Sequence, residues 1–171
     1  MITDYIILSL YSFSLFVILI YSLLQLQLVQ NFKKAKNRTN KMIEEPKKWP
    51  KVTIQLPLYN EKYVVKRLLE NLSKLDYPLS KLEIQVLDDS TDSSKLYTQE
   101  LTQSLVEKGI NAKYIHRTDR KNFKAGALKE GLKVAEGEFI AVFDADFLPQ
   151  SNWLKKTIPH FKKANIGVVQ T

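Results

Sequence analysis

The chain begins with an apolar segment, Tyr5 to Val29, that contains no charged residue. A helix needs about 20 residues to cross the hydrocarbon core of a membrane. A cleaved signal peptide would begin with basic residues and have a shorter apolar stretch, whereas this chain begins Met-Ile-Thr-Asp. The segment therefore predicts a retained transmembrane helix within residues 1–31, rather than a buried helix of a globular domain.

A basic segment, residues 32–51, follows the apolar one. It holds eight Lys or Arg against Glu44 and Glu45, so most of the net charge of +8 lies in it. Pro46 and Pro50 block helix formation there, which predicts a juxtamembrane linker. By the positive-inside rule the rest of the chain is expected on the cytoplasmic side of the membrane. A charge concentrated beside an apolar segment also argues against nucleic acid as a partner.

Strand and helix patterns alternate in the remainder, residues 52–171. The patterns predict strands at 52–56, 83–87, 112–115, 139–143 and 166–170. They predict helices at 61–75, 93–108, 124–135 and 152–161, with Pro159 breaking the last. Repeated βαβ units indicate an α/β fold with a mostly parallel sheet and helices on both faces. Because the chain ends inside its last predicted strand, we expect 52–171 to be the N-terminal part of a longer domain.

Two carboxylates, Asp144 and Asp146, follow the apolar run 139–143. Five apolar residues in a row predict a central strand that is buried on both faces. On an extended chain these carboxylates would point the same way, and a divalent cation such as Mg²⁺ or Mn²⁺ would relieve their repulsion. The alternative is a loop in which one of them caps the next helix. The absence of cysteine excludes a Cys-ligated zinc site.

Polar motifs also follow the first two predicted strands. In Pro57-Leu-Tyr59-Asn-Glu61, Tyr59 offers a ring for stacking on a nucleobase, although an ordinary βα turn would look the same. In Asp88-Asp89-Ser-Thr-Asp, an aspartate can accept a hydrogen bond from a base N–H or a ribose hydroxyl. Helix capping is the alternative for these aspartates.

A basic loop precedes the helix predicted at 124–135 and contains Arg117, Arg120, Lys121 and Lys124. A helix N-terminus and neighbouring cations favour an anion such as phosphate, and Gly126 permits a close backbone approach. A solvated basic loop is the alternative. Since the carboxyl ends of parallel strands meet at one edge, the four motifs together provide for a metal-bound nucleoside diphosphate.

These motifs, in this order, resemble those of family 2 glycosyltransferases with the GT-A (Rossmann-like) fold. The nearest branches are the membrane-bound cellulose- and mannan-synthase-like enzymes and the ceramide-glucosyltransferase-like enzymes. The resemblance implies that Asp146 ligates the metal and that Asp144 contacts the nucleotide or shares the metal. It implies that the other nucleotide-sugar-binding residues are Pro57, Tyr59 and Glu61 around the nucleoside, Asp89 with Asp88 at the base, Lys124 near the diphosphate, and Ala145.

The resemblance further implies an inverting, metal-dependent hexosyl transfer from a UDP- or GDP-sugar to a polysaccharide or glycolipid acceptor, with Mg²⁺ or Mn²⁺ as cofactor. The family's catalytic base and the Gln-x-x-Arg-Trp motif of its processive members come later in the sequence. We therefore expect the base, and further membrane helices, beyond Thr171. The alternatives are a membrane-anchored nucleotide-binding module without transfer activity, and a basic protein of the membrane surface that binds lipid or nucleic acid.

Overall fold

The computed structural model describes residues 1–36, 46–162 and 165–170. The chain divides into two units, one within residues 1–43 and one within residues 44–171. Part of the predicted basic linker, including Arg38, Lys41, Glu44 and Glu45, lies outside the described residues.

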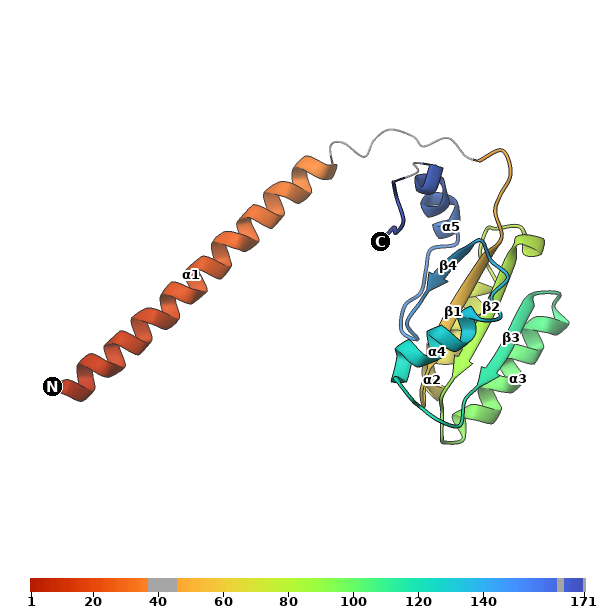
Figure 1. Cartoon of the computed structure of the whole chain (residues 1–171), viewed down its shortest axis with the longest axis horizontal. Helices are drawn as coiled ribbons and strands as arrows, with labels where there is room; N and C mark the ends of the chain where they lie inside the picture. Colours follow the sequence, from red (N-terminus) through yellow and green to blue (C-terminus); the bar gives the residue numbers. More distant parts are fainter. Residues whose placement is uncertain (37–45, 163–164, 171) are drawn as a thin grey trace. The chain divides into compact units, whose positions relative to one another are not determined.

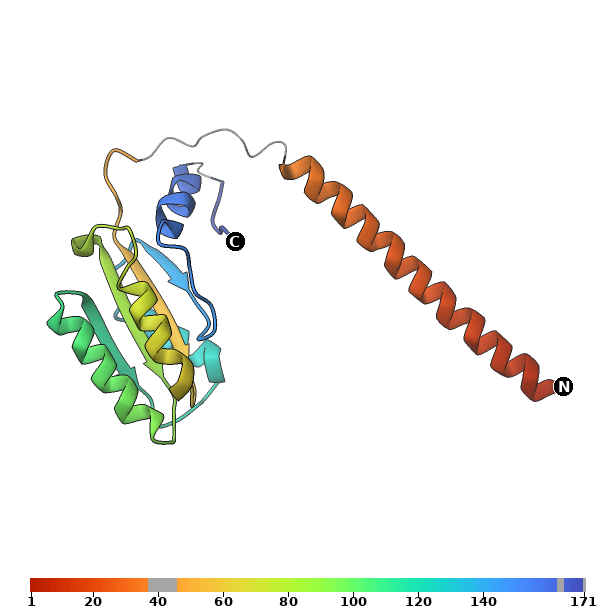
Figure 2. The ribbon, with the colours of Figure 1, turned by 180° about the vertical axis from the view of Figure 1, so that it is seen from behind.

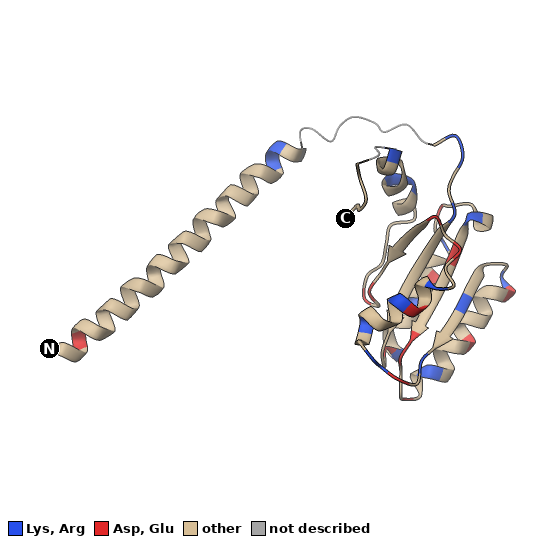
Figure 3. Ribbon diagram, viewed as in Figure 1, with Lys and Arg blue, Asp and Glu red and all other residues tan. Residues whose placement is uncertain are grey.

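The first unit is a single helix, α1 (Ile2–Lys36), which extends five residues beyond the predicted end at residue 31. Its charged residues lie only near its two ends (Figure 3). The hydroxyls of Ser14 and Ser22 donate to the carbonyls of Leu10 and Ile18, each at 2.9 Å, so these polar groups are satisfied within the helix. By length and composition α1 is apolar enough to cross a membrane.

The second unit is built on a parallel sheet, as predicted (Figure 1). Its strands are β1 (Val52–Leu58), β2 (Leu82–Asp88), β3 (Asn111–His116) and β4 (Phe139–Val142), in the spatial order β3-β2-β1-β4. The register pairs Val52 with both Leu82 and Phe139. The strands therefore start level with one another, while β1 and β2 run further than β4.

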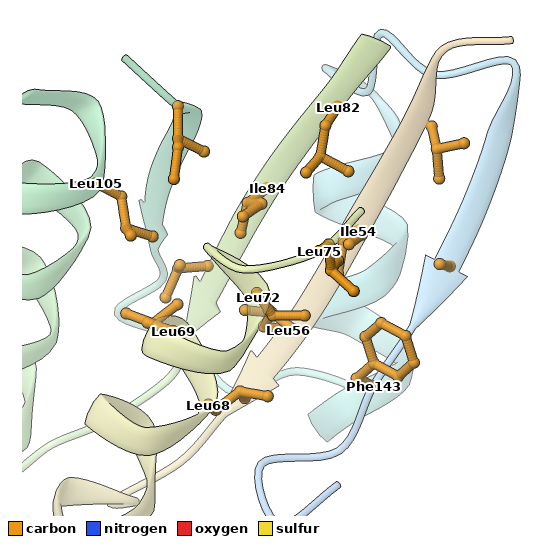
Figure 4. Packing of buried hydrophobic residues seen from close by; sticks show 14 of the residues in the cluster. Ile54, Leu56, Leu68, Leu69, Leu72, Leu75, Leu82, Ile84, Leu105 and Phe143 are labelled. Carbon is orange, nitrogen blue, oxygen red and sulfur yellow. The ribbon is translucent and has the colours of Figure 1, made fainter. Parts of the chain in front are cut away.

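Helices cover both faces of this sheet, which also confirms the prediction. Helices α2 (Lys62–Leu72) and α3 (Ser94–Glu107) lie on one face, and α4 (Phe123–Leu132) lies on the other (Figures 1 and 2). Alternate residues of β1 and β2 pack against α2 to form the core. Figure 4 shows this cluster, which includes Ile54, Leu56, Ile84, Leu68, Leu69 and Leu72.

The sheet face beneath α4 is polar instead. Thr53, Gln55, Glu83 and Gln85 are buried, and the Gln55 amide donates to the Gln85 amide oxygen at 3.0 Å. Burial alone would raise the pKa of Glu83, but hydrogen bonds from Lys113 and Thr53 outweigh it and lower that pKa. The bonds from Gln55 to Gln85 and from Thr53 to Glu83 satisfy much of this polar layer, while the Gln85 amide nitrogen has no hydrogen-bond partner among the described residues.

Strand β4 differs from the prediction of a central strand buried on both faces. It lies at the edge of the described sheet, and the side chains of Ile140 and Val142 are 38% and 44% exposed. Helix α4 packs on β1 and β2. Ile140 and Val142, which align with Thr53 and Gln55 of β1, lie on the same face of the sheet but one strand further out.

The end of the chain also differs in part. The helix predicted at 152–161 begins as α5 (Trp153–Thr157) and becomes the 3₁₀-helix η2 (Ile158–Lys162), which contains Pro159. The predicted break at Pro159 is thus confirmed. Residues 166–170 form no strand, so that prediction is wrong. A strand needs a backbone partner, and none of the described strands pairs with this segment.

Candidate functional site

The site lies where the order of the strands changes direction. From β1 the chain moves to β2 and β3 on one side, then returns to β4 on the other side of β1. In parallel α/β sheets, ligands bind beyond the carboxyl ends of the strands at such a switch point. Here β1 leads into Tyr59 and β4 leads into Asp144.

A pocket of about 190 Å³ opens at this place. It contains five residues that were expected to bind the nucleotide sugar: Pro57, Tyr59, Glu61, Asp89 and Lys124. Its remaining lining residues are Leu58, Arg120 and Ala127. The β1–α2 loop, the β2–α3 loop and the start of α4 therefore meet around one small cavity.

Hydrogen bonds hold the first two of these loops together. The Asn60 N–H donates to the Ser90 hydroxyl at 2.8 Å, and the Thr91 N–H donates to the Asn60 amide oxygen at 3.0 Å. Asn60 has φ 57, a left-handed conformation that asparagine tolerates better than most residues. This crosslink fixes Tyr59 relative to Asp89.

Asp89 is held by Arg117. The Arg117 Nε donates to Asp89 Oδ1 at 2.8 Å, and Nη2 bonds the second carboxylate oxygen. The same guanidinium donates to the carbonyl oxygens of Lys121 and Phe123, at 3.3 and 3.1 Å. The hydrogen bond to Asp89 raises the pKa of Arg117. Arg117, expected with the phosphate-binding cations, thus orients Asp89 and the loop before α4.

Arg120 was identified in the sequence only as one cation of this basic loop. Its guanidinium carbon lies 3.3 Å from the centroid of the Tyr59 ring, which is a close cation–π contact. Its Nε is buried and has no hydrogen-bond partner among the described residues. Arg120 therefore supports Tyr59 and brings an unsatisfied donor to the pocket. No spacing in the sequence indicates this contact.

Asp88, the neighbour of Asp89, faces away from the pocket lining. It is fully buried, and its carboxylate accepts from the Ser90 N–H at 2.8 Å and from the Tyr114 hydroxyl at 2.7 Å. Burial and the Asp88 carboxylate together raise the pKa of Tyr114, so that hydroxyl remains a donor. Asp88 shapes the loop that carries Asp89.

The start of α4 is a tight and strained segment. Asn122 and Phe123 have φ 62 and 47, and a left-handed conformation is unusual for a bulky residue such as Phe123. A Cβ on Gly126 would lie 2.1 Å from the Lys121 carbonyl oxygen. The close backbone approach expected at Gly126 is therefore an approach to the Lys121 carbonyl of the same loop. This tight packing positions Lys124.

The two carboxylates after β4 lie in a turn, because the Phe147 N–H donates to the Asp144 carbonyl at 3.1 Å. The expectation of an extended chain here is wrong. Asp144 and Asp146 are exposed, whereas Ala145 packs in the core. Asp144 forms an ion pair with Lys124, which links this turn to the pocket.

The chemistry of this turn fits a divalent cation that is shared with a substrate. The described residues contain no group of three or more His, Cys, Asp or Glu that could hold a metal by themselves. Mg²⁺ is commonly bound by one or two carboxylates together with the phosphates of a substrate. Asp144 and Asp146 offer carboxylates of that kind beside Lys124, a residue suited to phosphate.

Comparison with known proteins defines the class. The family model described as Glycosyl transferase family 2 matches residues 53–171, so the chain belongs to this family. The parallel sheet and the similarity to a solved mannosyltransferase confirm the expected GT-A fold.

The similar proteins include several mannosyltransferases. Glucomannan 4-beta-mannosyltransferase 1 of Cyamopsis tetragonoloba is 44% identical over 133 residues, covering 75% of this chain and 25% of the relative. A probable glucomannan 4-beta-mannosyltransferase 11 of Oryza sativa subsp. japonica is 46% identical, covering 72% of this chain and 22% of the relative. The chain thus spans about a quarter of the length of these curated relatives.

The solved structure of the mannosyltransferase PcManGT from Pyrobaculum calidifontis, in complex with GDP-Man and Mn²⁺, matches with a TM-score of 0.68. That match has 28% sequence identity and covers 81% of this chain and 41% of PcManGT. S. aureus TarS matches with a TM-score of 0.50 at 31% identity, covering 56% of this chain and 16% of TarS.

Proposed function

We propose that this chain carries the donor-binding part of a membrane-anchored hexosyltransferase that uses GDP-mannose and builds a polysaccharide. The observation that carries the proposal is the meeting of Tyr59, Asp89 and Lys124 in one pocket at the switch point, with Asp144 joined to it through Lys124. The choice of GDP-mannose is supported by the glucomannan 4-beta-mannosyltransferases and by PcManGT, which was solved with GDP-Man.

In this proposal the nucleoside occupies the pocket. Tyr59 stacks on the base and is held in place by Arg120. Asp89 uses two acceptor positions on Arg117, and a carboxylate has about four, so it can still accept from the base or ribose. Pro57 and Glu61 complete the wall. We assign Asp88 to positioning Asp89, because Asp88 is fully buried and Asp89, not Asp88, lines the pocket.

The diphosphate lies next to the turn after β4 in this proposal. Asp146 and Asp144 hold the divalent cation, Mg²⁺ or Mn²⁺, which when bound neutralises charge on the leaving diphosphate. Lys124 leaves Asp144 for the diphosphate, since both partners of this ion pair are about half exposed and such pairs are weak. Its ammonium then stabilises the same negative charge.

The wider reaction follows the family resemblance. We propose an inverting transfer in which a base outside this donor pocket deprotonates the acceptor hydroxyl. We also propose that α1 spans the membrane and that the second unit lies on the cytoplasmic side, where the basic residues after α1 are expected. The acceptor is a growing glycan, with a glycolipid as the alternative.

A displacement experiment tests the donor assignment. The full chain is purified in detergent with Mn²⁺ and titrated with a fluorescent GDP analogue, which is then displaced by GDP-mannose or by UDP-glucose. We expect GDP-mannose to displace it at the lower concentration. Tyr59→Ala should weaken binding roughly 5- to 150-fold, as expected for lost base–aromatic stacking. Equal displacement by UDP-glucose would refute the choice of guanosine.

Tyr63→Ala is the matched control, because Tyr63 is another tyrosine of the same region and is 95% exposed. It should bind the analogue as the unsubstituted chain does. If Tyr59→Ala also binds normally, this pocket is not the nucleoside site. The alternative function, nucleotide binding without transfer, predicts the same binding but no radiolabelled glycan when membranes containing the complete gene product are given labelled GDP-mannose.

A further inference from the structure

A second pocket lies at the opposite end of the sheet from the donor site. It has a volume of about 480 Å³ and contains Lys51, Lys81 and Phe139, which stand at the beginnings of β1, β2 and β4. Its other lining residues are Pro46, Lys48, Trp49, Pro50, Glu138, Ile158, Phe161 and Lys162. The donor site opens at the carboxyl ends of the strands, so one pocket can be filled without blocking the other.

The charge of this pocket favours an anion. Four lysines line it, Lys48, Lys51, Lys81 and Lys162, against a single glutamate, Glu138. Lys51 also pairs with Glu136, which in turn pairs with Lys113 outside the pocket. The lining therefore keeps an excess of positive charge.

Aromatic side chains form the walls of this pocket, and ring contacts and a hydrogen bond hold them in place. Trp49 packs edge-on against Tyr77 with ring centroids 5.5 Å apart, and the Tyr77 hydroxyl donates to the Pro50 carbonyl at 2.7 Å. On the other side, Phe139 and Phe161 pack with centroids 4.8 Å apart. Tryptophan is enriched at the interface between membrane and water, and lysines close to a membrane are attracted to its anionic lipids.

The sequence ties this pocket to α1. Residues 37–45 alone separate the end of α1 from Pro46, and a fully extended chain of that length reaches roughly 30–35 Å. If α1 spans a membrane, this tether limits how far Pro46 and Trp49 can lie from that membrane's surface.

We propose that this pocket binds the phosphate headgroup of an anionic phospholipid in the membrane that α1 crosses. The lysines attract the headgroup, and Trp49 lies at the boundary between headgroup and water. Headgroup binding would hold the second unit at the membrane in one orientation. This inference rests on α1 as a membrane helix and is independent of the donor site, so either can fail without the other.

The test uses the full chain in lipid nanodiscs with the Trp153→Phe substitution, which leaves Trp49 as the only tryptophan. A minor fraction of the phosphatidylcholine is replaced by brominated phosphatidylserine or by brominated phosphatidylcholine, and quenching of Trp49 is measured. We expect stronger quenching by the serine lipid and loss of this difference in high salt, because salt screens exposed charges. Equal quenching by the two lipids would overturn the proposal.

A matched pair of variants locates the effect. The triple substitution Lys48→Gln, Lys81→Gln, Lys162→Gln should lower the preference for the serine lipid by roughly fivefold per lysine. The control triple Lys66→Gln, Lys108→Gln, Lys133→Gln changes the net charge equally but removes lysines that do not line the pocket. It should keep the preference. An equal loss in both triples would mean that net charge alone is responsible, and would refute a built site.

Two further measurements separate headgroup binding from misfolding and from the binding of a free anion. Thermal unfolding of both triples should match that of the parent, and binding of the fluorescent GDP analogue should be unchanged in both. If the triple variant of the pocket lysines is unfolded, the single variant Lys48→Gln is used instead, since Lys48 is exposed. This single variant must still lower the preference for the serine lipid. Addition of inorganic phosphate should leave the quenching difference intact. If phosphate at constant ionic strength abolished this difference in quenching, the pocket would instead be a binding site for a free anion.

Discussion

The ion pair between Arg117 and Asp89 allows a sharp prediction about stability. Only 12% of the Arg117 side chain and 5% of the Asp89 side chain are exposed. Arg117→Met keeps a side chain of similar length but removes the charge, so Asp89 is left buried without its cation. Breaking a buried pair in this way costs about 3–5 kcal/mol. We expect about 3 kcal/mol here, because the pair lies beside a pocket that admits water.

Urea unfolding measured by tryptophan fluorescence provides the assay. Both tryptophans, Trp49 and Trp153, belong to the second unit and none lies in α1, so the signal reports this unit alone. A loss of about 3 kcal/mol should also lower Tm by about 10 °C. The control Arg67→Met removes an arginine on the exposed side of α2 and should stay within about 0.5 kcal/mol of the parent.

A double-mutant cycle separates the pair from the rest of the loop. Adding Asp89→Asn to Arg117→Met removes the stranded charge, so the double variant should lose less stability than the two single losses added together. A cost below about 1 kcal/mol for Arg117→Met, or simple additivity in the cycle, would refute the structural role given to this pair.

Three other perturbations have definite expected results. Gly131→Ala would place a Cβ 2.7 Å from the Gln55 amide nitrogen and 2.7 Å from a Leu87 methyl carbon. This clash should destabilise the second unit by about 1–3 kcal/mol in the urea assay. The control Lys129→Ala, on the exposed surface of α4, should be nearly neutral. Hydrogen bonds from Lys113 and Lys51 lower the pKa of Glu136 from 4.5 to about 2, and a depressed carboxyl contributes stability above its unfolded pKa that is lost on acidification. The free energy of unfolding should therefore fall as the pH is lowered from about 4.5 to 2, and it should fall less in Glu136→Gln. The same pH dependence in Glu136→Gln as in the parent would contradict the lowered pKa of Glu136. Arg120→Ala removes the contact with Tyr59 and should weaken binding of the GDP analogue by about 2- to 30-fold, and normal binding would show that Tyr59 needs no such support.

The architecture was largely predictable because its signals are local. Alternating apolar residues predict β1, and Pro78, Gly109 and Gly137 indicate loops between helices and strands. The environment of β4 was not predictable in the same way. Five apolar residues indicate how hydrophobic a strand is, but they do not indicate which strands and helices lie beside it, and Ile140 is 38% exposed.

The site was predictable at the level of motifs. Parallel strands bring their carboxyl ends to one edge, so Tyr59, Asp89 and Lys124 were expected near one another, and the pocket contains all three. The pairing of Arg117 with Asp89 depends on the path of residues 117–123, and no pattern of residue types fixes a loop with two left-handed positions.

The two neighbouring aspartates illustrate the same limit. Successive residues of a strand point to opposite faces, so either Asp88 or Asp89 has to turn away from the pocket. The sequence does not say which. In the structure Asp89 lines the pocket and Asp88 is buried beneath it.

The central claim is that this sheet edge binds a nucleoside-diphosphate sugar through a metal held by Asp146 and Asp144. Calorimetric titration of the full chain with GDP-mannose, in Mn²⁺ and in EDTA, tests it most directly. We predict binding that needs Mn²⁺ and that weakens by about tenfold or more in Asp146→Asn, with Glu107→Gln, an exposed acid at the end of α3, as the unaffected control. Equal affinity in Mn²⁺ and EDTA, or normal affinity in Asp146→Asn, would contradict the claim.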